Sequence, residues 1–522
     1  MYDLLIKNAK VVDGTSAPWY IADVAVVAGK IVKIGKITGE AAETVDAEGH
    51  VLAPGFIDIH SHSDANVLKY RENESRILQG ITTEIGGDCG ISPMPIDPEK
   101  ISLVRNFGEI KDFDWRDAAG FFDRVEKSGI SANFGMMVGH GAIRLAAMPF
   151  EDRAPTEAEL EKMRKLTAES MEQGCFGMSS GLIYPPGSFA QNDELIELAK
   201  VVASYGGLYK THMRWEGDNV IQSVEESVEV AEKTGIAVQV DHHKVTGRKN
   251  WQYKSRATIA LIARAREMGL DVTADQYPYC ASATTMTTQL PRWAHEGGTP
   301  ELVKRLKDPA TRQKIDEYIR ENAKKNLRTW DSLFVSSVKS PENAWVKGKH
   351  LQEIAEAQGK DPINAMLDLL TQEEGSVGQI SFGMCEEDVE FIMAQPFVMI
   401  GSDGGAHPIA TKDIPHPRAF GTFPRVISKY CRDRKLFSLE TAINKMTGMP
   451  AARLNLADRG LIKAGMWADL VLFDFDKIND TPTFVKPNVP CEGILRVYVN
   501  GVLTAQNGTH TGAVSGKVLR RG

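Results

Sequence analysis

The sequence has few cysteines, and no two of them are close together. Its 522 residues contain six, at positions 89, 175, 280, 385, 431 and 491, and they form no CxxC motif. This pattern argues against a disulfide framework. Scattered thiols are typical of proteins from a reducing compartment, so we expect a cytoplasmic protein with free cysteines.

Long hydrophobic runs and an excess of positive charge are also missing. No apolar stretch approaches the roughly 20 residues that a membrane-spanning helix needs. The opening stretch MYDLLIKNAKVVDG carries Asp3, Lys7 and Lys10, which is unlike a signal peptide. The formal net charge is −8, whereas a surface that binds nucleic acid is basic. We therefore expect neither a membrane nor a nucleic-acid partner, and nothing in the sequence predicts an oligomeric state.

What is present is an ordinary globular composition, with 42% hydrophobic and 25% charged residues. Short runs rich in Val and Ile, separated by Asp-Gly, Ala-Gly and Glu-Gly turns, fill the first 54 residues and return after residue 456. Such runs are typical of strands. We predict one small β-sandwich domain that is built from both chain termini, residues 1–54 plus 456–522.

The middle of the chain alternates short apolar runs with helical patterns. The runs cover residues 55–60, 81–87, 132–140, 176–181, 208–213, 237–243, 271–279 and 397–404. Eight β/α units in succession predict an α/β fold, a (β/α)₈ TIM barrel over residues 55–284 plus 381–455. Residues 285–380, polar and helical in pattern, are then an insertion and a candidate lid over the loops that carry active sites in such barrels.

The first apolar run ends in two histidines. The stretch LAPGFIDIHSHSD, residues 52–64, places His60 and His62 at alternate positions. Alternate side chains of a strand share a face, so both rings are expected at the mouth of the barrel. Taken alone, the pair is equally consistent with two exposed loop histidines.

Further side chains that can bind metal occur at the same place in other units. Cys89 follows the second run, His212 and His242 end the fifth and sixth, and Asp403 ends the eighth. Imidazole, thiolate and carboxylate together suit zinc best, although other divalent ions also fit. His243 must face away from His242, so we expect it either to pack in the interior or to support a metal ligand without binding the metal itself.

Three other motifs contain residue types that could carry out chemistry. His140, in MVGHGAIR, is more simply a histidine bonded to loop backbone than a metal ligand. Ser179 and Ser180, in GMSSGLIYPPG, do not form the G-x-S-x-G elbow of a serine nucleophile. The stretch GGDCGISP lacks the GK[ST] ending of a phosphate-binding loop.

The phrase PGFIDIHSH, the later GSDG and the split β-domain resemble the amidohydrolase superfamily of metal-dependent hydrolases. Within it, six motifs between about residues 50 and 430 resemble N-acyl-D-amino-acid deacylases (D-aminoacylases): GGDCGISPMP, GMSSGLIYPPGSFA, KTHMR, VDHHKVTG, DQYPYCAS and IPHPRAFGTFPRV. The resemblance implies a zinc-dependent hydrolase that cleaves the amide bond of small N-acyl-D-amino acids.

The resemblance also assigns residues. It places one tightly bound zinc ion on Cys89, His212 and His242, and a weaker second site on His60 and His62 that shares Cys89. The cysteine replaces a lysine or glutamate of the fourth strand, and FGMSSG at that place has neither. Asp403 matches the catalytic aspartate. The residues that match substrate-binding positions are Lys244, Tyr277 and Arg418.

Some positions depart from the family pattern. Asp241 stands where the family often has serine, and Ala283 stands near an expected hydroxyl, which Ser282 or Thr284 could supply. The loop from Asp403 to Arg418 is longer than usual. These departures concern substrate preference. The preferred amino-acid side chain stays open. Arg292 and Lys244 could pair with an acidic side chain, whereas an apolar pocket could be lined by Met286, Leu290 and Trp293.

Two alternatives remain. A related amidohydrolase could act on a cyclic amide, as hydantoinases and dihydroorotases do, or on another N-acyl compound, but the missing fourth-strand lysine counts against the hydantoinase form. A metal-binding or assembly protein without turnover is the non-enzymatic alternative. Asp403 argues against it, because a scaffold needs no base beside a metal ion.

Overall fold

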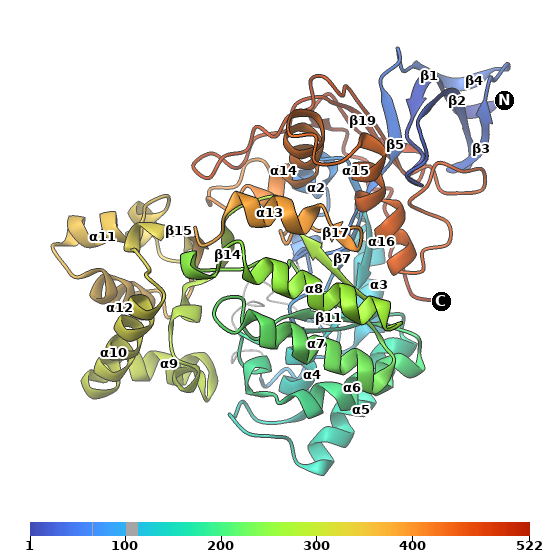
Figure 1. The fold of residues 1–522 in the computed structure, drawn as a ribbon. Helices are drawn as coiled ribbons and strands as arrows, with labels where there is room; N and C mark the ends of the chain where they lie inside the picture. The colour runs from blue at the N-terminus through green and yellow to red at the C-terminus, as the bar shows by residue number, and fades with distance from the viewer. Residues whose placement is uncertain (65, 101–112) are drawn as a thin grey trace.

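Both ends of the chain meet in one β-sheet in the computed structural model, which describes residues 1–64, 66–100 and 113–522 (Figure 1). The strands of this sheet are β1 (Tyr2–Val11), β2 (Tyr20–Val27), β3 (Lys30–Gly35), β4 (Ala41–Asp46), β5 (Val51–Pro54), β18 (Leu470–Phe473), β19 (Ile494–Val499), β20 (Val502–Gln506) and β21 (Thr509–His510). Strand β5 pairs in parallel with β1 and antiparallel with β18, so it joins the N-terminal and C-terminal strands.

Alternation along β1 explains how this sheet packs. Leu4 and Ile6 point into one apolar cluster, which also contains Leu470 from the C-terminal end, and Leu5 points into a second cluster with Ala25. Successive side chains of a strand face opposite sides, so one strand supplies both clusters. The prediction that both termini build one β unit is confirmed, and its boundaries at residues 54 and 456 stay a prediction.

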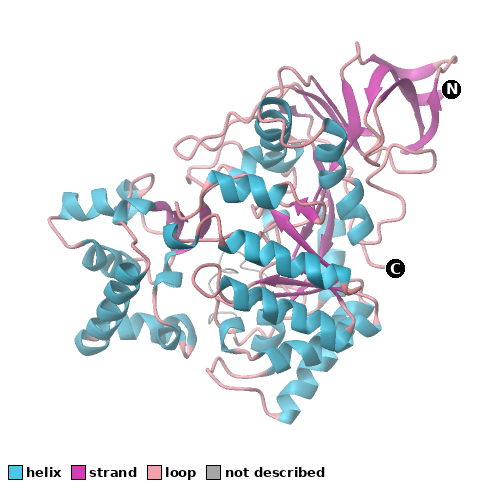
Figure 2. Cartoon of the chain, viewed as in Figure 1, coloured by secondary structure: helices cyan, strands magenta, loops and turns pink. Residues whose placement is uncertain are grey.

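Parallel strands form the centre of the molecule (Figure 2). They are β6 (Phe56–Asp58), β7 (Ile81–Gly86), β8 (Asn133–Met136), β9 (Val138–Gly139), β10 (Gly177–Gly181), β11 (Leu208–His212), β12 (Ala237–Val240), β13 (Val272–Gln276) and β17 (Val398–Ile400). Every predicted run contains one of them, except residues 132–140, which contain both β8 and β9. The predicted TIM barrel is confirmed.

The ring of strands closes at two seams. At the first seam, β8 and β9 are separated only by Met137. Met137 N donates to Gly86 O at the end of β7 at 2.8 Å, which joins the two groups of parallel strands. At the other seam, beyond the ends of β6 and β17, Ser61 and Gly404 form a parallel bridge. Several strands are shorter than predicted. Because β6, β12 and β17 end at Asp58, Val240 and Ile400, the candidate residues that follow them lie on loops.

Helices surround the barrel. They are α1 (Asn66–Lys69), α2 (Glu74–Ile77), α3 (Ala118–Ser128), α4 (His140–Ala147), α5 (Glu157–Glu172), α6 (Asn192–Ser204), α7 (Val220–Thr234), α8 (Lys254–Glu267), α13 (Glu386–Met393), α14 (Arg418–Arg425), α15 (Leu439–Met446) and α16 (Gly448–Arg453), with a π-helical stretch η9 (Val426–Asp433). Short 3₁₀ turns are η3 (Gly187–Phe189) and η4 (Arg248–Asn250). Helix α5 begins with a capping box of Thr156 and Glu159, which satisfies backbone N–H groups of its first turn.

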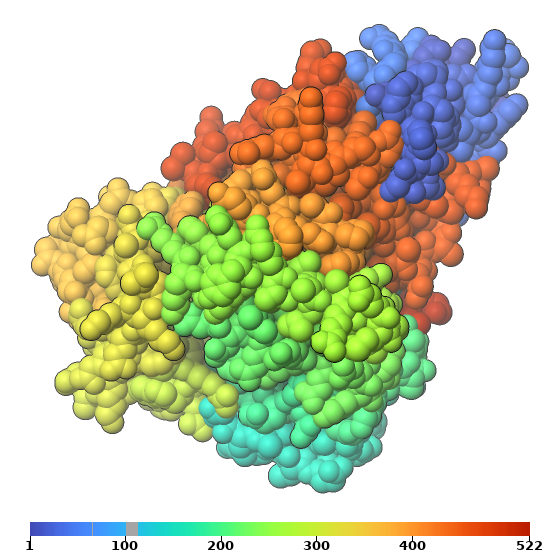
Figure 3. All heavy atoms as spheres, viewed as in Figure 1, coloured from blue at the N-terminus to red at the C-terminus, as the bar shows by residue number. Residues whose placement is uncertain are grey.

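The insertion between β13 and β17 forms a lobe of its own beside the barrel (Figure 3). Its elements are β14 (Ser282–Thr285), η5 (Met286–Gln289), η6 (Arg292–His295), α9 (Gly298–Lys307), α10 (Pro309–Lys325), η7 (Trp330–Ser332), β15 (Leu333–Val338), η8 (Pro341–Val346), α11 (Leu351–Gln358), α12 (Pro362–Gln372) and β16 (Val377–Ser381). The sequence predicted helices here, and the structure adds the antiparallel sheet β14–β16–β15. Its strands start at residue 282 and end at 381, slightly outside the predicted 285–380.

A buried carboxylate ties the terminal sheet to the barrel. Asp469, just before β18, pairs with the buried Arg459 and accepts hydrogen bonds from Asn133 Nδ2 of β8 at 3.1 Å and from Asn500 N at 2.7 Å. Asn500 Nδ2 in turn donates to Asn133 Oδ1 at 2.8 Å. Breaking a buried ion pair by removing one charge is costly, because the other charge stays desolvated without a partner.

We expect Asp469→Asn to lower the free energy of unfolding by about 3–5 kcal/mol, as measured by urea titration. The matched control is Asp458→Asn. Asp458 pairs with Lys30 at 3.3 Å, with half of its side chain exposed, so its loss should cost no more than about 0.5 kcal/mol. Equal stability of the two variants would contradict this role of Asp469.

Candidate active site

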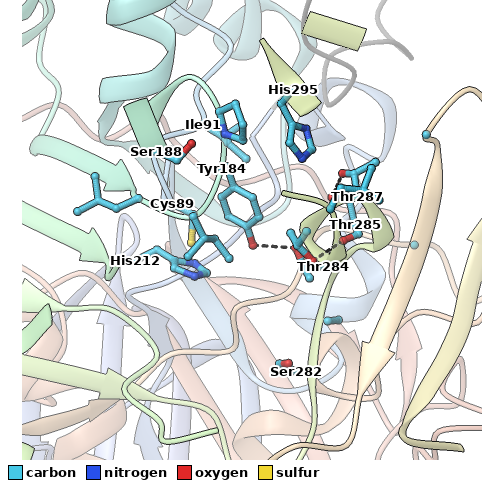
Figure 4. Close-up of a pocket in the computed structure, with 18 of the residues that line it drawn as sticks. Cys89, Ile91, Tyr184, Ser188, His212, Ser282, Thr284, Thr285, Thr287 and His295 are labelled. Carbon is cyan, nitrogen blue, oxygen red and sulfur yellow. Dashed lines mark hydrogen bonds between the residues drawn. The ribbon is translucent and has the colours of Figure 1, made fainter. Parts of the chain in front are cut away.

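A cavity of about 810 Å³ opens at the carboxyl ends of the barrel strands. One wall carries candidate residues from the loops after the strands, and the other is formed by the insertion, including Thr287, Leu302 and Tyr318. Figure 4 shows Cys89 and His212 on one side of the cavity and Tyr184 between them and the threonines of the insertion. This is the end of the barrel where chemistry is expected.

Side chains from four different loops converge at the barrel side of this cavity. One donor atom from each of His60, Cys89, His242 and Asp403 lies within 4.8 Å of the others. Cys89 Sγ is 3.5 Å from His60 Nε2 and 3.4 Å from His242 Nε2. His212 Nδ1 lies 2.9 Å from His242 Nε2. The mixture of thiolate, imidazole and carboxylate donors fits a zinc ion.

The remaining predicted ligand, His62, contacts the same group through Asp403. Its Nε2 is 3.0 Å from Asp403 Oδ1, and His60 Nε2 is 3.7 Å from the same oxygen. All five predicted metal-binding residues and the predicted catalytic aspartate are therefore close together in the structure.

Three of these residues have an unusual backbone. The φ angles are +52° at Cys89, +34° at His242 and +51° at Asp403. Positive φ is uncommon for residues other than glycine and costs free energy, and such residues cluster at active sites. Here it occurs where the chain turns sharply after a strand and directs a side chain into the site.

The charges of the site keep its acidic groups ionised. Burial alone would raise the pKa of the Cys89 thiol, but His242, His60 and His62 hold it well below its usual value. Burial would also raise the pKa of the Asp403 carboxyl, yet Arg418 and His242 hold it well below the usual range. A thiolate is the form of cysteine that binds metal, and a carboxylate is the form of aspartate that accepts a proton.

A buried layer of charge lies behind the histidines, and no sequence motif indicated it. His60 Nδ1 is 3.2 Å from Asp275 Oδ1 and 3.5 Å from Asp241 Oδ1. Lys210 Nζ is 2.5 Å from Asp88 Oδ1 and 3.6 Å from Asp241 Oδ1. Lys210 and His212 stand at alternate positions of β11, so they share a face. That alternation was the signal available in the sequence.

The loop that carries Cys89 is fixed by the neighbouring strand β10. Ser179 Oγ accepts a hydrogen bond from Gly90 N at 3.0 Å and donates to Gly87 O. A Cβ at Gly181 would lie 2.2 Å from Cys89 O, so the close approach of loop and strand requires glycine there. Ser179 therefore has a supporting role, and the glycines around Cys89 serve packing.

Of the three predicted substrate-binding residues, Arg418 and Lys244 lie over the aromatic ring of the third, Tyr277. The Arg418 guanidinium lies 4.7 Å from the centre of the Tyr277 ring, and Lys244 Nζ lies 5.6 Å from it. Arg418 Nη1 also pairs with Asp403 Oδ2 at 2.7 Å. The Tyr277 hydroxyl is buried and has no hydrogen-bond partner among the described residues.

The other candidates lie outside this group. His140 Nε2 is 2.8 Å from the carboxylate of Glu194, so the expectation of a backbone partner is wrong for this nitrogen. His243 faces the interior and contacts Thr258 Oγ1 at 2.9 Å. Arg292 lines the cavity and pairs with Asp152, with Nε to Oδ2 at 2.9 Å. Thr284 Oγ1 is 2.8 Å from Tyr184 Oη (Figure 4).

Comparisons with known proteins all point to one family. The sequence profile of the "Amidohydrolase family" matches residues 43–505. D-aminoacylase from Alcaligenes xylosoxydans xylosoxydans is 37% identical over 100% of this chain and 98% of its own length. N-acyl-D-glutamate deacylase from the same organism is 36% identical over 99% of this chain and 96% of its own.

A solved structure is similar along the whole chain. The crystal structure of N-acyl-D-glutamate deacylase from Bordetella bronchiseptica, complexed with zinc and a phosphonate inhibitor, has 34% identity and a TM-score of 0.84, and the match covers 99% of each chain. With this agreement of profile, full-length sequence and fold, the chain belongs to the amidohydrolase family.

Proposed function

We propose that this protein is a zinc-dependent hydrolase that cleaves N-acyl-D-amino acids to a carboxylate and a free D-amino acid. The observation that carries the proposal is the convergence of Cys89, His242 and Asp403 at one side of the cavity. The full-length similarity to D-aminoacylase and N-acyl-D-glutamate deacylase supports the substrate class and its D configuration.

In this proposal Cys89, His212 and His242 hold one zinc ion tightly, and His60 and His62 form a weaker second site that shares Cys89. When bound, zinc supplies Lewis acidity: it makes water acidic enough to lose a proton near neutral pH and attracts the charge that develops on the carbonyl oxygen. The donors come from separate loops of one rigid barrel, which keeps the site preorganised.

Asp403 is the proposed general base and acid. Its pKa lies well below its usual value, so at neutral pH it is ionised and can take a proton from the attacking water. The carboxylic acid that results gives the same proton to the departing nitrogen. An amide requires this second step, because an unprotonated amine is a poor leaving group.

Arg418, Lys244 and Tyr277 are proposed to bind the α-carboxylate of the substrate. The planar guanidinium can donate to both carboxylate oxygens. The Tyr277 hydroxyl, buried without a partner among the described residues, is available for the same ligand. A substrate carboxylate there would also compete with Asp403 for Arg418, which leaves Asp403 free to exchange a proton.

A cyclic-amide hydrolase is the second candidate, but β10, Gly177–Gly181, carries no lysine, which counts against its hydantoinase form. Within the described residues, no helix is long and apolar enough to cross a membrane. We propose a cytoplasmic location because all six cysteines are free, as is typical of a reducing compartment.

A panel of N-acetyl-D-amino acids and their L-isomers tests the proposed reaction. We expect zinc-loaded protein to release the free amino acid from D-isomers, and we expect a chelator to abolish that release. Cleavage confined to L-isomers would refute the stereochemical assignment. Cleavage of hydantoins alone would favour the second candidate.

Asp403→Asn tests the proposed base. Asparagine keeps the size of the side chain but cannot take a proton, so kcat should fall by about 10²–10⁴-fold while zinc content is unchanged. Asp413→Asn is the control, because Asp413 lies in the same loop and its exposed carboxylate pairs with Lys347 at 3.2 Å. Steady-state kinetics and elemental analysis decide the case, and an unchanged kcat in Asp403→Asn would exclude the role.

A further inference from the structure

Glu216 contacts three site residues at once, and nothing in the sequence analysis assigned it a role. It lies on the loop after β11, four positions beyond His212, and lines the cavity. Its Oε1 is 2.5 Å from Lys244 Nζ, 3.3 Å from His242 Nδ1 and 3.6 Å from His212 Nε2. Only 13% of its side chain is exposed.

In both histidines, the ring nitrogen that faces Glu216 is not the one proposed to bind zinc. These outer nitrogens are His242 Nδ1 and His212 Nε2. His242 turns Nε2 toward Cys89 Sγ, and His212 turns Nδ1 toward the same place. A neutral histidine that gives one ring nitrogen to a metal ion carries its proton on the other. That outer N–H needs an acceptor, and a carboxylate fixes both the tautomer and the ring orientation.

Within the described residues, Glu216 Oε1 is the carboxylate oxygen that lies within 4 Å of both outer nitrogens. His212 Nε2 is buried and has no hydrogen-bond partner among the described residues, and Glu216 Oε1 lies 3.6 Å from it. One carboxylate can serve both rings because each of its oxygens has two lone pairs.

His212, Glu216 and His242 could together bind a cation, and the Lys244 ammonium group lies beside Glu216 and His242. One donor atom from each of His212, Glu216 and His242 lies within 4.8 Å of the others. The Lys244 ammonium sits 2.5 Å from Glu216 Oε1 and 2.7 Å from His242 Nδ1. The side chain of Lys244 is therefore held between the carboxylate of Glu216 and the ring of His242.

An ammonium group can donate but cannot accept. When His242 Nδ1 carries a proton, as zinc binding through Nε2 requires, Lys244 can no longer donate to it. Glu216 then remains the partner that holds Lys244 in place.

We propose that Glu216 is a positioning residue that fixes the ring protons of His212 and His242 for zinc and anchors Lys244 for the substrate carboxylate. The inference rests on the proposed zinc site and extends it to a group that touches neither the metal nor the reacting atoms. It predicts two separable effects of Glu216, one on zinc retention and one on KM.

Asp218 supplies a matched control from the same loop. Its carboxylate binds Lys249 Nζ at 2.7 Å and Asn250 Nδ2 at 3.0 Å, and it contacts neither histidine nor Lys244. If Glu216 only stabilised the loop, Glu216→Gln and Asp218→Asn would behave alike.

The experiment compares zinc-loaded wild type, Glu216→Gln, Glu216→Asp and Asp218→Asn. The rate of zinc loss to a chelator, zinc content by elemental analysis, kcat and KM are measured for each. Mutating a residue that hydrogen-bonds to a metal ligand typically lowers metal affinity or activity by 10–100-fold. We expect Glu216→Gln to lose zinc 10–100-fold faster and to show a raised KM, and Asp218→Asn to match wild type. Glu216→Asp, which keeps the charge, should fall between them.

Wild-type zinc retention in folded Glu216→Gln would overturn the proposal, as would equal losses in Glu216→Gln and Asp218→Asn. Should Glu216→Gln not fold, Glu216→Asp decides the question, because its shorter side chain must also release zinc faster. Zinc loss is measured without substrate. A wild type that binds zinc but cleaves no N-acyl-D-amino acid would therefore refute the proposed function and leave this test intact.

Discussion

Two backbone hydrogen bonds at the seam of the barrel hold the site together. Asp403 N donates to His60 O at 2.9 Å, and His62 N donates to Gly404 O at 2.8 Å. They join the loop after the first barrel strand to the loop after the last, so distant parts of the sequence become neighbours. The proposed base and two proposed ligands are thus fixed by main-chain geometry.

Buried side chains reinforce this seam. Ser402 N donates to Asp58 Oδ1 at 2.8 Å, and Arg76 Nη1 donates to Ser402 Oγ at 2.9 Å. Buried polar groups of this kind are tolerated only when their partners are in place. The same principle applies to the charge layer behind the histidines, where Lys210 offsets Asp88 and Asp241. In front of this layer, the histidines and Arg418 favour the ionised forms of Cys89 and Asp403 in a buried site.

Much of this arrangement could be predicted from the sequence, because the alternation of apolar runs with helical patterns indicates the barrel and the ends of the runs indicate the site. The eight apolar runs located the barrel strands, and the end of each run located His212, His242 and Asp403. The sequence did not reveal the sheet within the insertion, because β14, Ser282–Thr285, is short and only partly buried. Nor did it reveal Glu216, which lies in a loop without periodicity. The positive φ of Cys89, His242 and Asp403 was also hidden, because such turns usually carry glycine.

The central claim is that donors from separate strands converge on one cation at the mouth of the barrel. Anomalous diffraction at the zinc absorption edge, from crystals of protein loaded with one equivalent of zinc, tests it most directly. The account predicts one strong peak bounded by Cys89 Sγ, His212 Nδ1 and His242 Nε2. A peak that lacks Cys89 as a neighbour, or one outside the cavity, would contradict it.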